Sequence, residues 1–459
     1  MEFKMKKNVI LLILLMMIFT AAPVSANSAV RWWKGSDTGG SYLLDEDCPV
    51  VCEHEDLLFE IYEFPERYYR DPEEFTSIKS SVEASYTLHN PTDEKLEVRL
   101  VFPFGELPYY TDFSSYEIND LSGYSISKND EPLEYRVRYT YSSGSFNVYN
   151  ELKKLQDDYL ENDRFTADLK VYEYTYKAKG EYEAKDGLVA KAEIISDPSN
   201  WKMISVEQYS LTDGKLTLSY DLDDEKKEYT FYVIGEDLEQ EPLWSIENNE
   251  DIKIELVKKN ETVLKDFLLS HKEDENISDV DWYNACLTFL DQYKDNNVIG
   301  SLFKSVNSSL MLWLEYTLDF GPQETLNNKV KVLIYPDVDE GYDPTMYSYR
   351  YLVSPASTWA DFKDLDITIR TDYFLIDSDE AQEFKKNGND YTAHYDQLPA
   401  DEINFRLNSS AEPQRSGGSY SSAITIFILA VLAIGGLLLL LILFLIIKGI
   451  IKLIRKKNK

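Results

Sequence analysis

A long apolar segment near the C-terminus constrains the architecture of this chain more than any other feature. Ala423–Ile447 is 25 residues long and contains no charged residue. At about 1.5 Å of rise per residue, a helix of this length exceeds the roughly 30 Å hydrocarbon core of a bilayer. Positive residues remain on the cytoplasmic side of a membrane, and the segment is followed by Lys448, Lys452, Arg455, Lys456, Lys457 and Lys459. We therefore expect a transmembrane helix at 423–447 and a cytoplasmic tail at 448–459.

The N-terminus has the features of an export signal. Three lysines in the first seven residues precede the apolar run Val9–Ala22, which is followed by the small residues Val24-Ser25-Ala26. This order predicts a signal peptide at 1–26. An uncleaved anchor is the alternative, although the apolar run is short for a bilayer span. Both ends predict the same orientation: a single-pass protein of the cell membrane, with its N-terminal ectodomain outside.

Charge and composition limit what the ectodomain can be. The formal net charge of the chain is −34, and both ends are basic, so the segment between them is more acidic still. Such a surface repels nucleic acid and anionic lipid headgroups, and we expect no nucleic-acid partner. Aromatic residues make up 14% of the chain, which is unlike a disordered stalk. The length predicts two folded domains.

Three cysteines leave the disulfide question open. If residues 48–52 are extended, the Cα atoms of Cys48 and Cys52 lie roughly 13 Å apart, beyond the reach of a disulfide. A turn at Pro49 would bring them closer. Cys286 lies on an apolar helical stripe, so we expect a buried thiol there.

Alternating apolar residues predict a chain composed largely of strands. Val82–Leu88 and Leu96–Phe102 alternate on either side of the turn residues Asn90–Asp93, which predicts a hairpin. Leu310–Leu318 also alternates strictly and is interpreted as a strand. Gly321-Pro322 and then Lys329–Tyr335 follow it, which favours a second hairpin.

Helical periodicity is confined to short segments. We expect one helix at 147–162 and an α-helical insert at 263–308, with helices at 263–269, 280–293 and 301–306. The predicted fold class is mainly β: two β-sandwich-like domains with a small α-helical insert, plus one transmembrane helix. The predicted division after the signal peptide is an N-terminal segment 27–47, a first β-rich domain 48–196, a second β-rich domain 197–407 and a juxtamembrane linker 408–422.

No catalytic motif stands out. The four histidines, His54, His89, His271 and His394, lack metal-ligand spacing and are expected to be structural. The sequence has no phosphate-binding glycine loop and no Gly-x-Ser-x-Gly elbow. Pairs of carboxylates could hydrolyse glycosides, but acidic residues are so common here that their proximity in the sequence carries little weight.

One acidic loop is a weak candidate for calcium. Asp337, Asp339 and Asp343 surround Gly341, an arrangement that can converge oxygen atoms on Ca²⁺. The glycine is one position early for an EF-hand loop, and Ser348 replaces the final glutamate. A plain acidic turn is the main expectation, and no other cofactor is predicted.

Aromatic pairs and repeats offer possible platforms for sugars or peptides. They are Trp32-Trp33, Tyr109-Tyr110 and the alternating Tyr347, Tyr349 and Tyr351. Tyrosine at alternate positions of a strand more often packs half-buried against its neighbours.

Several passages resemble an uncharacterised family of membrane-anchored surface proteins from Gram-positive, clostridia-like bacteria. They are CPVVCEHEDLLFEI (48–61), HNPTDEKLEVRLVFPFG (89–105), DWYNA (281–285), LMLWLEYTLDFGPQE (310–324), and IYPDVDEGYDP followed by YRYLVSPASTWADF (349–362). The first predicted hairpin is also similar to those of vault/inter-alpha-trypsin (VIT)-type domains. The resemblance implies a tethered, β-rich ectodomain and supplies no catalytic residue.

The sequence therefore favours a non-enzymatic surface protein that binds, senses or organises the envelope. Its predicted partners are the membrane, through one C-terminal helix, and an unidentified extracellular ligand or protein. The alternative is a carboxylate-based, glycan-directed hydrolase of the cell envelope.

Overall fold

The computed structural model describes residues 38–44, 48–65, 69–105, 110–111, 123–142, 148–180, 188–195, 201–204, 208–212, 215–222, 228–246, 251–378, 384–399 and 402–415. The predicted signal peptide, transmembrane helix, tail and domain boundary near 197–200 lie outside these ranges. Among the described residues, no helix is both long and apolar enough to span a membrane.

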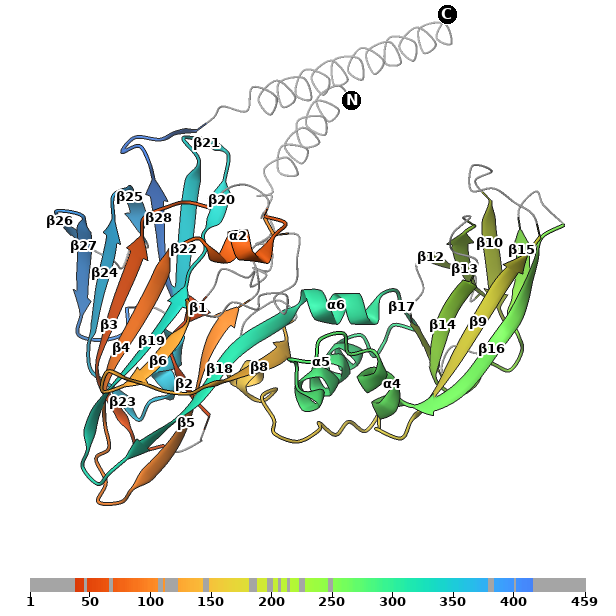
Figure 1. Ribbon diagram of the computed structural model, residues 1–459, viewed down its shortest axis with the longest axis horizontal. Helices are drawn as coiled ribbons and strands as arrows, with labels where there is room; N and C mark the ends of the chain where they lie inside the picture. The colour runs from red at the N-terminus through yellow and green to blue at the C-terminus, as the bar shows by residue number, and fades with distance from the viewer. Residues whose placement is uncertain are drawn as a thin grey trace, which may run out of the picture. The chain divides into compact units, whose positions relative to one another are not determined.

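The fold is mainly β and contains several sheets, as predicted (Figure 1). The largest sheet has nine strands, in the order β26-β27-β24-β3-β4-β19-β6-β7, with β23 also paired to β3. Its strands are β3 (Val51–Ile61), β4 (Ser81–His89), β6 (Ser125–Lys128), β7 (Glu131–Pro132), β19 (Thr325–Leu333), β23 (Asp361–Phe362), β24 (Leu365–Thr371), β26 (Lys385–Asn387) and β27 (Asp390–Tyr395).

A four-stranded sheet contains a strand, β18, that is buried along nearly its whole length. Its order is β2-β5-β18-β8, with bounds β2 (Tyr42–Leu43), β5 (Leu96–Gly105), β18 (Leu310–Phe320) and β8 (Arg136–Tyr141). The strand predicted at Leu310–Leu318 is confirmed, and Trp313 within it is fully buried. Its indole Nε1 donates a hydrogen bond to Thr140 Oγ1 at 2.8 Å.

Both predicted hairpins have the correct strands but the wrong pairing. β4 pairs with β3 and β19, whereas β5 pairs with β2 and β18, so the two arms of each expected hairpin belong to different sheets. The two chain reversals contact each other instead. Asn90 donates from its backbone N–H to the Glu324 carbonyl at 2.9 Å and from Nδ2 to the Gly321 carbonyl at 2.8 Å. A buried asparagine thus fastens two corners at which the chain passes between sheets.

The predicted helical insert is present as three helices. They are α4 (Leu264–Ser270), α5 (Asp279–Gln292) and α6 (Leu302–Ser308). Ser278 caps α5 by accepting a hydrogen bond from the Asp281 backbone N–H, as expected for an N-cap serine. The fully buried Trp282 joins two of the helices, because its Nε1 donates to the Leu268 carbonyl at 2.7 Å.

The helix predicted at 147–162 is shorter than expected. Only α3 (Val148–Leu152) forms, and α2 (Pro72–Thr76) is a further short helix. Beyond α3, tertiary contacts replace helical hydrogen bonds. Asn284 on α5 accepts from the Leu160 backbone N–H at 2.8 Å and donates to the Asp158 carbonyl at 3.0 Å. Asn284 on α5 therefore hydrogen-bonds to backbone groups that a longer α3 would have satisfied within the helix.

Two further sheets share one hydrophobic core. The first has the order β12-β13-β10-β15 and the second β16-β9-β14-β11-β17. Their bounds are β9 (Lys170–Lys179), β10 (Val189–Ile194), β11 (Trp201–Ile204), β12 (Gln208–Thr212), β13 (Lys215–Asp221), β14 (Glu228–Gly235), β15 (Leu243–Ile246), β16 (Lys253–Val263) and β17 (Val298–Ile299). Stacked rings contribute to this core, with Tyr174 and Phe231 centroids 5.2 Å apart.

By its contacts the chain divides into two compact units. One comprises Met1–Pro336, Tyr349–Asp372 and Asp379–Asn404, and the other Asp337–Ser348, Tyr373–Ser378 and Phe405–Lys459. Within the second unit, β20 (Asp337–Asp339) pairs with the first residues of β22 (Met346–Leu352), β25 (Phe374–Ser378) with the last residues of β28 (Glu402–Asn408), and β21 (Tyr342–Asp343) with β29 (Gln414–Arg415). Tyr349–Leu352 of β22 and Glu402–Asn404 of β28 belong to the first unit. Residues 408–415, which the sequence assigns to the linker, thus include the end of one strand and a short second one. Of the first unit's remaining short elements, β1 (Thr38–Gly39) pairs with β22 through Tyr351 and Leu352, and a 3-10 turn covers Ser354–Thr358.

None of the three cysteines, all of which lie in described segments, forms a disulfide. Cys286 is buried on α5, as expected, and burial raises the pKa of its thiol.

Candidate functional site

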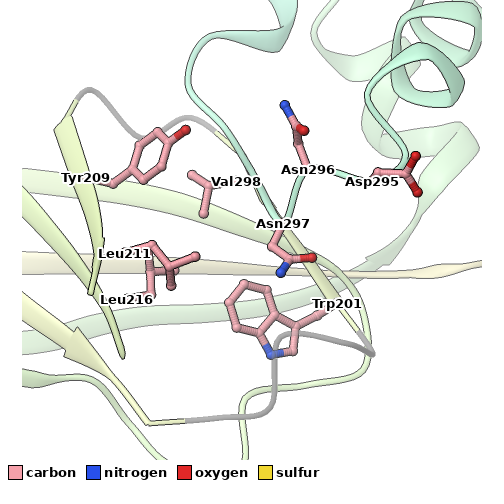
Figure 2. Close-up of a pocket in the computed structure, with 8 residues that line it drawn as sticks. All are labelled: Trp201, Tyr209, Leu211, Leu216, Asp295, Asn296, Asn297 and Val298. Atoms are coloured by element: carbon pink, nitrogen blue, oxygen red, sulfur yellow. The ribbon is translucent and has the colours of Figure 1, made fainter. Parts of the chain in front are cut away.

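A pocket opens beside the edge strand β12 (Figure 2). Its volume is about 280 Å³. The residues that line it, called the β12 pocket below, are Trp201, Tyr209, Leu211, Leu216, Asp295, Asn296, Asn297 and Val298. Figure 2 shows Tyr209 and Leu211 on one side and Asp295 on the other. The pocket therefore combines apolar side chains with two amides and a carboxylate.

Strand pairing explains how these residues meet. β12 and β13 pair in register from Gln208↔Ser219 to Thr212↔Lys215, which places Leu211 opposite Leu216. The segment after α5 reaches the same place because β17 adds to β11 in parallel, with Met203 opposite Val298. The Met203 backbone N–H also donates to the Asn297 carbonyl at 2.9 Å. Lining residues from 201–216 and from 295–298, which are far apart in the sequence, thus meet in one pocket.

Burial separates the pocket into a floor and a wall. Leu216, Val298 and Trp201 are at most 7% exposed and form the floor. Tyr209 and Leu211 are 50% and 58% exposed, so they form a wall that remains in contact with solvent. An apolar floor with polar groups at its rim is the usual composition of small-ligand sites.

Lys202 hydrogen-bonds to the segment that carries the polar residues of the pocket. It is buried on β11, and its Nζ donates to the carbonyls of Tyr293, at 3.1 Å, and Asn296. Tyr293 is the C-cap of α5, where a positive charge is favoured by the helix dipole. Burial nevertheless lowers the pKa of Lys202 to about 8, with a further contribution from the charge of Arg164.

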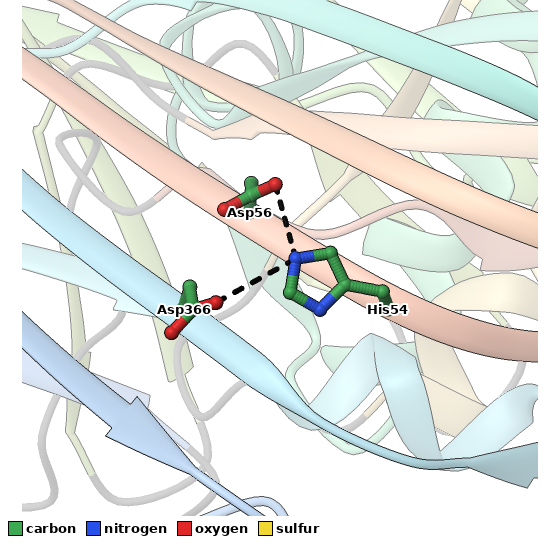
Figure 3. A group of neighbouring side chains, drawn as sticks. All are labelled: His54, Asp56 and Asp366. Atoms are coloured by element: carbon green, nitrogen blue, oxygen red, sulfur yellow. Dashed lines mark ion pairs between the residues drawn. The ribbon is translucent and has the colours of Figure 1, made fainter.

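A second cluster of ionisable groups lies on the nine-stranded sheet (Figure 3). His54 and Asp56 come from β3 and Asp366 from β24, and one ligand atom of each lies within 4.8 Å of the others. His54 Nε2 is 3.0 Å from Asp56 Oδ2 and 3.7 Å from Asp366 Oδ2. On the other side of the ring, His54 Nδ1 hydrogen-bonds with Asp364 Oδ1. We call His54, Asp56, Asp364 and Asp366 the His54 cluster.

Register and a β-bulge place the His54 cluster on one face. Asp366 lies opposite Asp56 in the parallel pairing of β24 with β3, and opposite His394 in the antiparallel pairing with β27. A shift of register between Cys52 and His54 lets two successive residues, Glu53 and His54, be partly exposed, while Glu55 is buried. Bulges commonly redirect a side chain in this way.

The electrostatics of both histidines follow from the carboxylates around them. Partial burial by itself lowers the pKa of His54, but the hydrogen bond with Asp364 and the charge of Asp56 outweigh it, so the net direction is upward. The hydrogen bond of His394 Nδ1 with Asp366 Oδ1, 2.8 Å long, raises the pKa of His394.

The residues singled out in the sequence lie elsewhere. Asp337 and Asp339 are on β20 and Asp343 is on β21, and they do not form a group of three with ligand atoms within 4.8 Å. Asp339 instead accepts a hydrogen bond from the Gly341 backbone N–H at 2.8 Å, as in an acidic turn.

The aromatic platforms considered from the sequence are largely packed. Tyr110, Tyr349 and Tyr351 are at most 2% exposed, which confirms the packing interpretation for them. Trp32, Trp33 and Tyr109 lie outside the described residues. Sequence reasoning missed both the β12 pocket and the His54 cluster. The one available signal for the pocket was the pair of apolar residues Tyr209 and Leu211, at alternate positions of one short segment.

Comparisons with known proteins do not show which family this chain belongs to. No family model matches it, and neither does any curated protein. Among solved structures, the chain is similar to the crystal structure of "a putative nutrient binding protein" from Legionella pneumophila, with 8% identity over 82% of this chain and 72% of that one. The TM-score is 0.32. At this level of similarity, nothing about function follows.

Proposed function

We propose that this chain is a membrane-tethered surface protein whose β-rich ectodomain binds a small amphipathic ligand in the β12 pocket. The observation that carries this proposal is the composition of the pocket: a buried apolar floor, an exposed tyrosine and leucine, and a rim of Asp295, Asn296 and Asn297. A saccharide unit or a single side chain of a peptide has matching chemistry. Each offers one apolar face for Tyr209 and Leu211 and polar groups for the amides.

The size of the pocket sets the scale of the ligand. A volume of about 280 Å³ is at the lower limit of small-molecule sites, which begin at about 300 Å³. One sugar ring or one side chain fits such a space, and the rest of a longer ligand would extend over the exposed β12. Because β12 is an edge strand of its sheet, an extended peptide could also pair with its backbone.

The pocket supports binding more than the hydrolase alternative. Glycosidases need two carboxyl groups about 5–9.5 Å apart across the scissile bond. The β12 pocket supplies a single carboxylate, Asp295, whose side chain is 90% exposed. The geometry at this position suits recognition of a ligand.

The tether and the location belong to the same proposal. The apolar segment 423–447 with its basic tail, and the signal-like N-terminus, support a single-pass protein with its ectodomain outside the cell. We further propose that the ectodomain is built from two β-sandwich-like domains, and that the chain belongs with the clostridia-like surface proteins that it resembles. The shared core of the two sheets that contain β9–β16 supports the first of these points.

Immobilised carbohydrate and peptide libraries test the function. The wild-type chain should bind a defined set of members, and variants that truncate Tyr209 or Leu211 should lose that binding. Equal binding by the variants would contradict the proposal.

A further inference from the structure

The His54 cluster concentrates negative charge around one imidazole ring. Asp56, Asp364 and Asp366 all contact His54. The cations nearest to them along β24 and its preceding loop engage other carboxylates: Lys363 pairs with Glu53, and Arg370 pairs with Asp390 and Glu60. The cluster therefore presents three carboxylates to a single histidine.

The contacts of the ring fix its tautomer. A carboxylate oxygen of Asp364 against Nδ1 requires a proton on that nitrogen. In a neutral imidazole the lone pair then lies on Nε2, which faces Asp56 Oδ2 and Asp366 Oδ2. A lone pair that faces two anionic oxygens is repulsive unless a proton on Nε2 or a metal ion lies between them. In metal-binding histidines, a carboxylate commonly accepts the N–H of the ring nitrogen that does not bind the metal, and so orients the ring.

His394 orients Asp366, the second residue with an oxygen that faces His54 Nε2. Asp366 Oδ1 contacts His394 Nδ1 at 2.8 Å, which leaves Asp366 Oδ2 directed toward His54. The backbone carbonyl of Asp364 accepts from the Glu55 N–H at 3.1 Å and keeps Asp364 beside the ring. Two of the three inward-facing ligand atoms are thus held in place by a neighbour.

We propose that His54, Asp56 and Asp366 bind a divalent transition-metal ion, with Zn²⁺ as the best match, and that Asp364 and His394 are positioning residues for the ligands. Tetrahedral coordination at about 2.0–2.1 Å puts neighbouring ligand atoms about 3.3 Å apart. The separations of 3.0 and 3.7 Å from Nε2 bracket that value. An imidazole ligand favours zinc, copper or nickel over calcium and magnesium.

Exposure leaves the site accessible. The side chains of His54, Asp56 and Asp366 are 30%, 59% and 43% exposed, so an ion can enter and water or an external ligand can complete its coordination. The site lies on β3 and β24, whereas the β12 pocket lies on β11–β13 and β17, so the two proposals can fail independently.

Titration of the metal-free full chain in detergent with ZnCl₂, followed calorimetrically, tests the site. We expect one saturable site, which about a hundredfold excess of CaCl₂ does not occupy. His54→Ala and Asp366→Asn should each weaken Zn²⁺ binding by about 100-fold or more, and Asp364→Asn by about 10–100-fold. His89→Ala is the matched control, because His89 lies on the neighbouring β4 and contacts Thr325 Oγ1. It should leave the affinity unchanged.

A second readout separates loss of a ligand from loss of the fold. Co²⁺ bound at the site should give a visible absorption spectrum that changes in His54→Ala, while the far-ultraviolet circular dichroism of each metal-free variant stays like that of the wild type. Zn²⁺ binding that survives His54→Ala, or wild-type binding no tighter for Zn²⁺ than for Ca²⁺, would overturn the proposal. A protonated His54 held by three carboxylates, with no affinity for metal, would then account for the same contacts.

Discussion

Arg138 on β8 and Asp281 in the first turn of α5 form a buried, two-pronged ion pair. Arg138 Nε lies 2.9 and 3.1 Å from the two carboxylate oxygens, and Nη2 lies 2.9 Å from Oδ1. Both side chains are at most 4% exposed. The same carboxylate accepts from the Tyr139 backbone N–H at 3.2 Å. The pair thus fastens the helical insert to the four-stranded sheet.

Removing the carboxylate of Asp281 from this ion pair should lower the stability of the fold. Asp281→Ala leaves the buried guanidinium of Arg138 with Glu315 as its remaining buried partner, and we expect the free energy of unfolding to fall by about 3–5 kcal/mol. The control is Glu228→Ala, because Glu228 is 55% exposed in its pair with Lys177 and should cost under about 1 kcal/mol. Urea unfolding of the three proteins compares them. Similar shifts in the two variants would mean that the buried pair does not hold the insert.

The pKa of Lys202 predicts a particular pH dependence. Its folded-state pKa of about 8 is below the unfolded value of about 10.4, so the neutral amine favours folding and the charged ammonium opposes it. Relative to Lys202→Met, the wild type should therefore gain stability as the pH rises from about 8 to about 10.4, by about 3 kcal/mol in total. The tyrosines are the same in both proteins, so their effect on the free energy of unfolding cancels when one protein is compared with the other. A difference that stays constant across this range would show that Lys202 titrates normally.

The acidic loop should show no specific response to calcium. Asp339 already accepts from the Gly341 N–H, and Asp339→Asn keeps an oxygen that can accept the same bond. We expect CaCl₂ and NaCl of equal ionic strength to change the melting temperature equally, through screening of the acidic surface. If Asp337, Asp339 and Asp343 did bind Ca²⁺, the ion would stabilise the fold by about 2.7 kcal/mol at a hundredfold excess over Kd, and Asp339→Asn would abolish most of that gain.

Topology can be tested on intact cells. Protease added outside should release a fragment that ends near 416–422, because this Ser/Gly-rich stretch immediately precedes the apolar segment. A tag placed after Lys459 should be protected until the cells are lysed. Cleavage or labelling of that tag from outside would reverse the proposed orientation.

The sequence predicts strands well and strand partners poorly, for a physical reason. The alternation in Leu310–Leu318 reflects burial on one or both faces, which is a local property, and the strand is present as β18. Partner choice depends on contacts between distant residues. The turn at Asn90–Asp93 looks like that of a hairpin, yet it carries the chain from one sheet to another, where Asn90 hydrogen-bonds with Gly321 and Glu324.

The candidate sites were hidden from the sequence for the same reason. His54 and Asp364 are 310 positions apart, and the parallel pairing of β3 with β23 and β24, on either side of Asp364, brings them together. Asp366 and His394 meet through the next pairing along the sheet. The β12 pocket likewise depends on the parallel addition of β17 to β11. No spacing within the sequence encodes these contacts, whereas the buried thiol of Cys286 followed from the helical stripe around it.

The central claim is that the β12 pocket binds a small amphipathic ligand, and binding of the full chain in detergent to carbohydrate and peptide arrays tests it most directly. Tyr209→Ala and Leu211→Ser each remove an exposed apolar contact, so we expect about 10–100-fold weaker binding to the members that the wild type selects. Tyr62→Ala is the matched control, because Tyr62 is an exposed tyrosine, 48% accessible, just beyond the end of β3. Wild-type binding that is lost in both pocket variants and retained in Tyr62→Ala is the predicted result. Binding that is unchanged in the pocket variants, or a wild type that selects no member of either array, would contradict the account.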